Sequence, residues 1–245
     1  MSTQPRPVDS VRRLLGAVDA KAARLASDFH PAWVDAAWAR LGPQMAGLTQ
    51  RVPVRRHSML LAGAYGIVWP ELDAFREPAH RIALLDRSRL MKVLAACAID
   101  ARRESVRRSV GRTVRELLIE GIGESAYQQV LDSPLRGIKS ADPLAAMEVG
   151  QDRLAVDGFK ALCAQGAWRD QTLISIVRLS LQPAAFGDPG QGDERSRVST
   201  VRGVDRTVDR LHHYFPELAW LFGSDMDRAL SASKTASSVA QTSLH

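Results

Sequence analysis

Apolar residues recur at three- and four-residue steps along most of this chain, a spacing that is typical of amphipathic α-helices. One such stripe runs through residues 8–27, from Val11 to Leu25. A second helix is expected to begin at Pro31, because the missing N–H of proline costs nothing in a first helical turn, and to end at Gly42. Prolines divide residues 43–80 into short pieces, for which the pattern predicts one buried helix near 57–69.

The strongest helical periodicity lies in residues 86–121. Asp86 is a suitable N-cap residue and Gly121 a suitable C-terminal stop. Two apolar stripes lie between them, one over residues 90–101 and the other over 106–118. The pattern does not decide between one long helix and two helices that break near Asp100.

The second half of the chain is also expected to be helical. Asp142 before Pro143 predicts the start of a helix that runs towards Gly166. Residues 173–181 combine β-branched side chains with partial alternation, so a strand is the alternative there. We favour a helix, because no second strand pattern is present to pair with this one.

Glycine, proline and polar residues then divide the chain. Residues 183–200 have the composition of a flexible loop, and residues 201–230 form a short helical unit after it. Residues 231–245 contain almost no large apolar side chain, which predicts a disordered tail. The sequence therefore predicts an all-α fold in which an irregular helical main domain, residues 1–182, is followed by that loop, the small C-terminal helical unit and the tail.

Composition places the chain among ordinary globular proteins. It has 245 residues, of which 45% are hydrophobic and 24% charged, enough apolar surface for one good core or two small ones. The longest apolar run, residues 59–69, is about half of the roughly 20 residues that a helix needs to cross a bilayer. The first ten residues lack the pattern of a secretory signal. We expect a cytoplasmic protein with no direct membrane insertion, in which Cys97 and Cys163 are reduced, buried and inert.

No catalytic or cofactor motif stands out. Residues 121–126 fit the form of a dinucleotide-binding turn, but a helical pattern precedes them, so we interpret them as a helix end with a new start at Glu124. The histidines stand apart, except for His212 and His213, which would point about 100° apart on a helix. We therefore expect no enzyme activity, no catalytic residues, no cofactor and no metal.

The most unusual feature is an arginine-rich segment, residues 102–115, in a chain of net charge +6 and pI near 9.8. On one helix, Arg108, Arg112 and Arg115 would share a face. A solvated helix face, an interface with an acidic protein and a nucleic-acid site all stay open, although the segment lacks lysine and aromatic residues for stacking. The candidate interface residues are Arg102, Arg103, Arg107, Arg108, Arg112 and Arg115.

Three separated blocks carry a resemblance to a known family. They are Phe29-His-Pro-Ala-Trp33, residues 84–127 from Leu-Leu-Asp-Arg to Gly-Glu-Ser-Ala-Tyr, and residues 214–222, Tyr-Phe-Pro-Glu-Leu-Ala-Trp-Leu-Phe. Together they resemble the K component of type III secretion systems, the SctK family, especially its branch in plant-associated and related proteobacteria. We interpret the aromatic and proline segments as core rather than interface.

This resemblance implies a non-enzymatic cytosolic adaptor of the injectisome sorting platform. Such an adaptor links the cytoplasmic domain of the inner-membrane ring, the D component, to pods built from the Q component, near the stalk and the ATPase. It would dock at the cytoplasmic face of the inner membrane and be needed for protein secretion. No family contact residue is carried over to this sequence. The alternative functions are a helical nucleic-acid-binding regulator that acts through its arginines and a small enzyme with an unmarked pocket.

Overall fold

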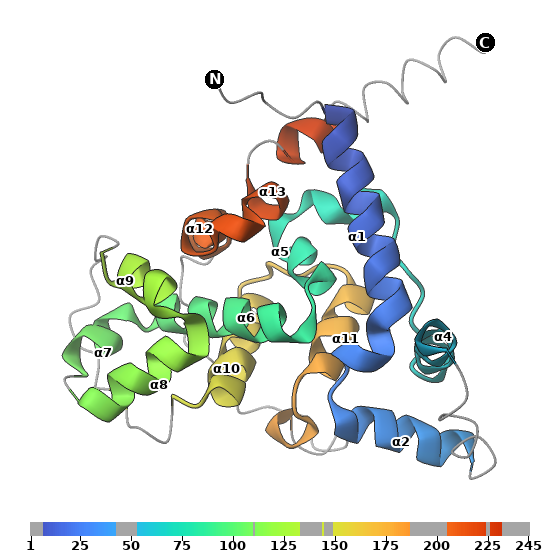
Figure 1. Cartoon of the computed structure of the whole chain (residues 1–245), viewed down its shortest axis with the longest axis horizontal. Helices are drawn as coiled ribbons and strands as arrows, with labels where there is room; N and C mark the ends of the chain where they lie inside the picture. Colours follow the sequence, from blue (N-terminus) through green and yellow to red (C-terminus); the bar gives the residue numbers. More distant parts are fainter. Residues whose placement is uncertain are drawn as a thin grey trace.

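The computed structural model describes residues 7–42, 53–109, 111–132, 144, 149–186, 205–223 and 226–231, and their regular structure is helical without any strand (Figure 1). The all-α class is therefore confirmed. The α-helices are α1 (Pro7–Asp28), α2 (Pro31–Leu41), α4 (Val54–Ala64), α5 (Pro78–Arg81), α6 (Arg87–Ala101), α7 (Arg103–Arg108), α8 (Arg112–Ile122), α9 (Glu124–Asp132), α10 (Gln151–Ala164), α11 (Gln171–Ser180), α12 (Asp205–Tyr214) and α13 (Ala219–Phe222). The 3₁₀ turns are η2 (Leu72–Arg76), η3 (Ile82–Leu84), η5 (Pro183–Phe186) and η6 (Pro216–Leu218).

The pair α6 and α10 forms the centre of the molecule (Figure 1). Every residue of α6 from Val93 to Asp100 is buried, because α10, α8, α9 and α12 surround it. Gly158 of α10 lies directly on α6, and a Cβ atom added there would stand 1.9 Å from the carbonyl oxygen of Leu94. The two helices therefore meet backbone to backbone, a contact that glycine permits.

A buried charge network fastens α1 to the start of α6. Lys21 is fully buried, and its Nζ donates to the carbonyl of Leu85 at 2.7 Å and lies 2.8 Å from the carboxylate of Asp28. Asp28 also accepts from the backbone N–H of Arg87 at 3.2 Å and from Nε of Arg24 at 3.1 Å. Burial lowers the pKa of Lys21, and the neighbouring carboxylate opposes that shift. The paired charges fix where α1 crosses the core.

Arg81 joins α5 to the last described helical residues. Its side chain is fully buried, and Nε donates to the carbonyl of Phe75 at 2.7 Å. Nη1 donates to the carbonyl of Leu221 at 3.0 Å, and Nη2 lies 2.5 Å from the carboxylate of Asp227. The guanidinium fork thus holds α13 and the helical segment 226–231 against α5.

Asp100, near the end of α6, makes a second connection to the C-terminal helices. Its carboxylate accepts from the hydroxyl of Thr207 at 2.5 Å and from the hydroxyl of Tyr214 at 2.8 Å, both on α12. Arg103 at the start of α7 pairs with the same carboxylate. These contacts join α12 to the core, while the division of the chain into residues 1–182 and 201–230 stays a prediction.

Several predicted helices are confirmed with small shifts of their ends. The stripe over residues 8–27 is α1, and Pro31 lies in the first turn of α2. The ambiguous residues 173–181 lie in α11 up to Ser180. Asp170 caps the start of this helix, because its carboxylate accepts from the N–H of Leu173 at 2.9 Å. Asp86 caps α6 as expected, because its carboxylate accepts from the N–H of Arg89 at 3.0 Å.

Other boundaries were wrong for identifiable reasons. The helix expected near 57–69 ends at Ala64, and it lies on the outer side of α1, so that Met59 is 68% exposed rather than buried. The stop expected at Gly121 is at Gly123, whose φ of 91° favours glycine, while Gly121 is buried inside α8. The expected new start at Glu124 is confirmed.

The helix expected to run from Asp142 towards Gly166 is not continuous. Residues 149 and 150 are not helical, and α10 starts at Gln151 after Gly150, which offers no capping side chain. The predicted end is confirmed, because Gly166 follows α10 with a φ of 69°. The Asp142–Pro143 pair, most of the predicted loop (187–200) and nearly all of the predicted tail (232–245) lie outside the described residues.

Candidate protein-binding surfaces

The arginine-rich segment is not one helix. α6 ends at Ala101, α7 ends at Arg108, and α8 begins only at Arg112. The break near Asp100 was one of two open alternatives, whereas the second break, around Gly111, was not expected. The shared face predicted for Arg108, Arg112 and Arg115 is therefore wrong, because the helix that would align them is interrupted.

Each of the six candidate arginines has a partner inside the chain. The partners are Asp157 for Arg102 at 2.7 Å, Asp100 for Arg103, the carbonyl of Leu131 for Arg107, Glu104 for Arg108 at 3.0 Å, Glu116 for Arg112 at 2.7 Å and Glu124 for Arg115 at 3.6 Å. Exposure divides the set, since the side chain of Arg112 is 91% exposed and that of Arg103 only 11%. Arg103 belongs to the buried Asp100 network. For the more exposed arginines, such as Arg112, the interface stays a prediction.

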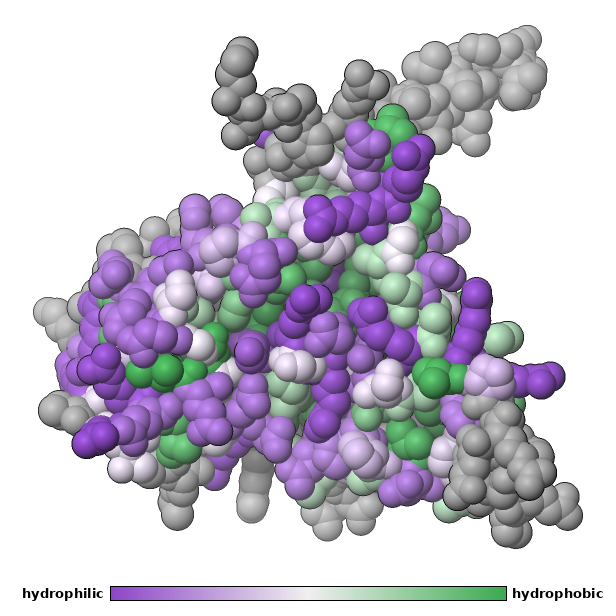
Figure 2. All heavy atoms as spheres, viewed as in Figure 1, coloured by the Kyte–Doolittle hydropathy of each residue, from purple (hydrophilic) through white to green (hydrophobic). Residues whose placement is uncertain are grey.

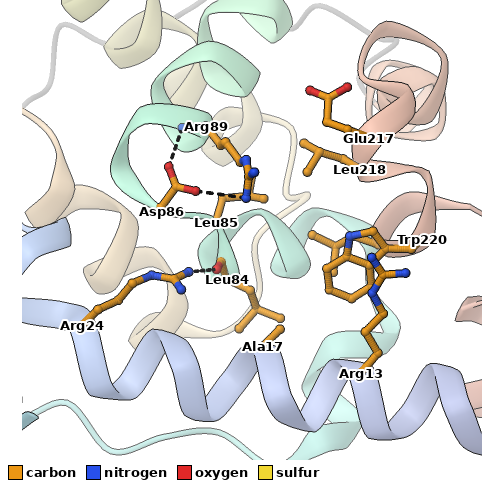
Figure 3. Close-up of a pocket in the computed structure, with 11 residues that line it drawn as sticks. Arg13, Ala17, Arg24, Leu84, Leu85, Asp86, Arg89, Glu217, Leu218 and Trp220 are labelled. Carbon is orange, nitrogen blue, oxygen red and sulfur yellow. Dashed lines mark hydrogen bonds and ion pairs between the residues drawn. The ribbon is translucent and has the colours of Figure 1, made fainter.

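A second polar surface lies between α1, the start of α6 and the η6–α13 turn (Figure 3). It is a hollow of about 290 Å³, which we name the α1–α13 groove. Its lining residues are Arg13, Ala17, Arg24, Leu84, Leu85, Asp86, Arg89, Glu217, Leu218, Trp220 and Leu221. Three segments that are distant in sequence thus converge on one site.

Arg13 and Trp220 form one wall of the groove. The Cζ atom of Arg13 lies 4.2 Å from the centroid of the Trp220 ring, a cation–π arrangement that links α1 to α13. Figure 3 shows the guanidinium lying over the indole, while the carboxylate of Glu217 points away from this pair. Among the described residues no carboxylate pairs with Arg13.

The opposite wall carries Arg89 and Arg24. Arg89 lies 3.3 Å from the carboxylate of Asp86 and keeps a side chain that is 61% exposed. Arg24 is engaged more fully, because it donates to the carbonyl of Leu84 at 2.9 Å as well as to Asp28. Three arginines and two carboxylates line the groove, which leaves it with one positive charge in excess.

The other polar candidates have structural roles. His80 lies within hydrogen-bond distance of the carbonyl of Ala74 through Nδ1, at 2.6 Å, and accepts from the N–H of Arg169 through Nε2, at 2.9 Å. These two partners assign the ring proton to Nδ1. The prediction that His212 and His213 point apart was wrong, since their ring centroids lie 3.9 Å from each other. Within the described ranges no group of three potential ligands is placed to hold a metal ion.

Both cysteines are free, Cys97 buried and Cys163 half-buried. Burial raises the pKa of the Cys97 thiol and raises that of Cys163 to about 11. Hydrophilic residues cover most of the face seen in Figure 2, and apolar residues occupy smaller areas between them. Among the described helices none is long and apolar enough to span a bilayer.

Comparison with known proteins decides the family. A family model described as bacterial type III secretion protein (HrpB4) matches residues 15–217. The chain belongs to the HrpB4 family. It is therefore a component of a type III secretion system, and the resemblance to the SctK-type component is confirmed. The chain matches no curated protein and no solved structure.

The groove of this HrpB4-family chain was not foreseen from the sequence. Trp220 was expected in the core, and it is half-buried there with one face under a guanidinium. Arg13 is an exposed residue of an amphipathic helix, and nothing in its local sequence distinguishes it from its neighbour Arg12. Both lie just outside the matched range 15–217. No local signal relates residues 13, 89 and 220, because only the packing of α1 and α13 around the start of α6 brings them together.

Proposed function

We propose that this chain is a non-enzymatic adaptor of the sorting platform, which bridges the inner-membrane ring, the D component, and the pods of the Q component. The family match over residues 15–217 is the observation that carries the proposal. The adaptor would work in the cytoplasm, docked at the cytoplasmic face of the inner membrane and close to the stalk and the ATPase.

The geometry supports a bridging role because the two candidate surfaces lie at opposite ends of α6. Asp86 and Arg89, at the beginning of this helix, line the α1–α13 groove, whereas Arg103 and the rest of α7 follow its end. The 15 residues of α6 span about 22 Å. Figure 1 shows α6 running between the two ends of this part of the molecule, and a helix of that length would keep two partners apart.

The arginine-rich end would contribute charge more than buried area. Its exposed members, such as Arg112, already pair with carboxylates of the same chain. Surface pairs of this kind are weak in water, about 1 kcal/mol or less, so an acidic partner exchanges them easily. Charges of this type steer association and set orientation rather than dominate affinity.

Reconstitution tests the bridge directly. The purified chain is mixed with the purified Q component, with the purified cytoplasmic domain of the D component, and with both, and each mixture is analysed by size-exclusion chromatography with light scattering. We expect two binary complexes and a ternary complex that is absent without this chain. The bridging role is refuted if either partner elutes alone in the presence of excess chain.

The arginine-rich surface is tested by replacing Arg108, Arg112 and Arg115 together with Glu. We expect weaker capture of one partner and reduced secretion, with an unchanged helical circular dichroism signal, because these side chains lie outside the core. Arg153, an exposed arginine on α10, changed to Glu serves as the charge control. Unchanged capture of both the pod and the ring components by the triple variant would remove this surface from the adaptor.

A further inference from the structure

We propose that the α1–α13 groove binds an acidic side chain, Asp or Glu, of a partner protein, and that Arg13 and Arg89 hold its carboxylate. The inference rests on the proposed function, since the partner would be one of the two components that the chain bridges. It assigns a second surface, which lies outside the arginine-rich segment.

Arg13 is prepared for such a contact. Trp220 covers the face of its guanidinium at 4.2 Å, which holds the flexible side chain in place without using its hydrogen atoms. The N–H donors lie in the guanidinium plane, so stacking leaves them free to bind two carboxylate oxygens side by side. Arginine and tryptophan are among the residue types that most often dominate binding energy at protein interfaces.

Arg89 provides the second positive group from the opposite wall. Asp86 holds it at 3.3 Å but also caps α6 through the N–H of Arg89, at 3.0 Å. Its side chain remains 61% exposed, so donors are left for a further acceptor. Arg24 differs, because Asp28 and the carbonyl of Leu84 occupy it and its role is to hold α1.

The lining favours a protein carboxylate over a polyanion. Asp86 and Glu217 share the groove with the arginines, and a nucleic acid or an anionic membrane, which presents many phosphates, would meet both negative groups. The volume of about 290 Å³ accommodates one or two side chains. Leu84, Leu85 and Leu218 supply apolar contacts for a residue next to the acid.

The test compares groove variants with a matched control in the full chain. Arg13→Gln and Arg89→Gln are combined, and Arg12→Gln is the control, because Arg12 is 78% exposed, neighbours Arg13 in α1 and lies outside the groove lining. Dissociation constants are measured by calorimetry for the purified Q component and for the purified cytoplasmic domain of the D component. We expect the double variant to bind one of them at least about tenfold more weakly, since a hydrogen bond to a charged group is worth about 1.5–3 kcal/mol.

The same experiment separates binding from folding. The other partner should bind the double variant within about twofold of the wild-type value, and Arg12→Gln should bind both normally. Trp220→Leu keeps most of the apolar area but removes the aromatic face, so it should weaken the same partner severalfold through the loss of Arg13 positioning. Normal affinity of the double variant for both partners overturns the inference, and an intact ternary complex in that case leaves the bridging role standing.

The carboxylate itself is identified by cross-linking. With p-benzoylphenylalanine in place of Glu217, irradiation of the complex marks the partner segment that lies in the groove, and mass spectrometry locates it. We expect an Asp or Glu in that segment. Changing it to the amide should weaken binding to the wild-type chain but should cause no further loss of affinity for the Arg13→Gln chain. A marked segment without an acidic residue refutes the inference. The inference is also refuted if the double variant loses binding to anionic vesicles or to RNA while its affinity for both protein partners is unchanged.

Discussion

Gly158 offers the sharpest test of how the core is built, because substitution by Ala sets two known effects against each other. In a helix interior Ala is more favourable than Gly by about 1 kcal/mol. At position 158, however, the added Cβ would stand 1.9 Å from the carbonyl oxygen of Leu94, whereas ordinary contact begins at 3.4 Å. Relief requires α10 to move away from α6 by more than an ångström, which disturbs the packing of the most buried helix.

Overpacking of a close-packed core costs about 1–3 kcal/mol and occasionally more, and an obstacle made of backbone cannot turn aside. Because the clash is with backbone, we take the upper end of this range, about 3 kcal/mol, and subtract the gain in helix propensity of about 1 kcal/mol. We therefore expect Gly158→Ala to lower the free energy of unfolding by about 2 kcal/mol. For a chain of this length that corresponds to a fall in melting temperature of about 4–8 °C. Circular dichroism at 222 nm, followed during heating and during urea titration, measures both quantities.

Gly16 is the matched control, since it lies inside α1 with no heavy atom within 4 Å of the position of an added Cβ. Gly16→Ala should therefore gain the propensity term and stabilise the chain by about 1 kcal/mol. The account of the α6–α10 contact is refuted if Gly158→Ala unfolds at or above the wild-type temperature while Gly16→Ala behaves as expected.

Three further expectations follow from the buried groups and the charge pairs. Asp100→Ala leaves the hydroxyls of Thr207 and Tyr214 without their acceptor, so the free energy of unfolding should fall by at least about 3 kcal/mol. The midpoint of urea unfolding should fall accordingly, and protease should release α12 early. An unchanged midpoint would contradict the network. Burial raises the pKa of Cys163 from 9.0 to about 11, so alkylation by iodoacetamide at pH 8 should be slow until urea is added. The stability that this thiol contributes below pH 9 should be lost as the pH rises towards 11. Rapid labelling of the native chain would exclude the described burial. Arg108, Arg112 and Arg115 each lie beside a glutamate of the chain, and these carboxylates repel the closely spaced phosphates of a nucleic acid. We therefore expect no mobility shift with duplex DNA or RNA at low salt. A shift that weakens steeply with salt would revive the nucleic-acid alternative.

Sequence periodicity predicted most helices because each has one apolar face against the core, and its caps are local. Asp86 and Asp170 act on N–H groups three residues away, so their effect is visible in a short stretch of sequence. Residues 173–181 were resolved as a helix by the lack of a pairing partner, which is a property of the whole chain. The exposure of α4 was missed because it depends on which side of α1 the helix packs.

The charged residues were harder to interpret for a physical reason. Arginine is typical both of exposed faces and of buried networks, and the sequence does not show which carboxylate lies nearby. Arg81 was not singled out, yet it is among the largest fully buried side chains and joins segments about 140 residues apart. Arg102 and Arg103, which were singled out for an interface, are bound to Asp157 and Asp100. Such pairings are long-range in part and arise only in the folded chain.

The uninterrupted helix α6 also fixes the relative orientation of the two surfaces that lie at its ends. Each residue added to a helix turns everything beyond it by about 100° and advances it by about 1.5 Å. One inserted residue would thus leave the groove where it is and swing α7 and α8 to another side of the molecule. Substitutions on either surface change how strongly a partner is held, whereas the length of α6 determines the direction from which the second partner must approach.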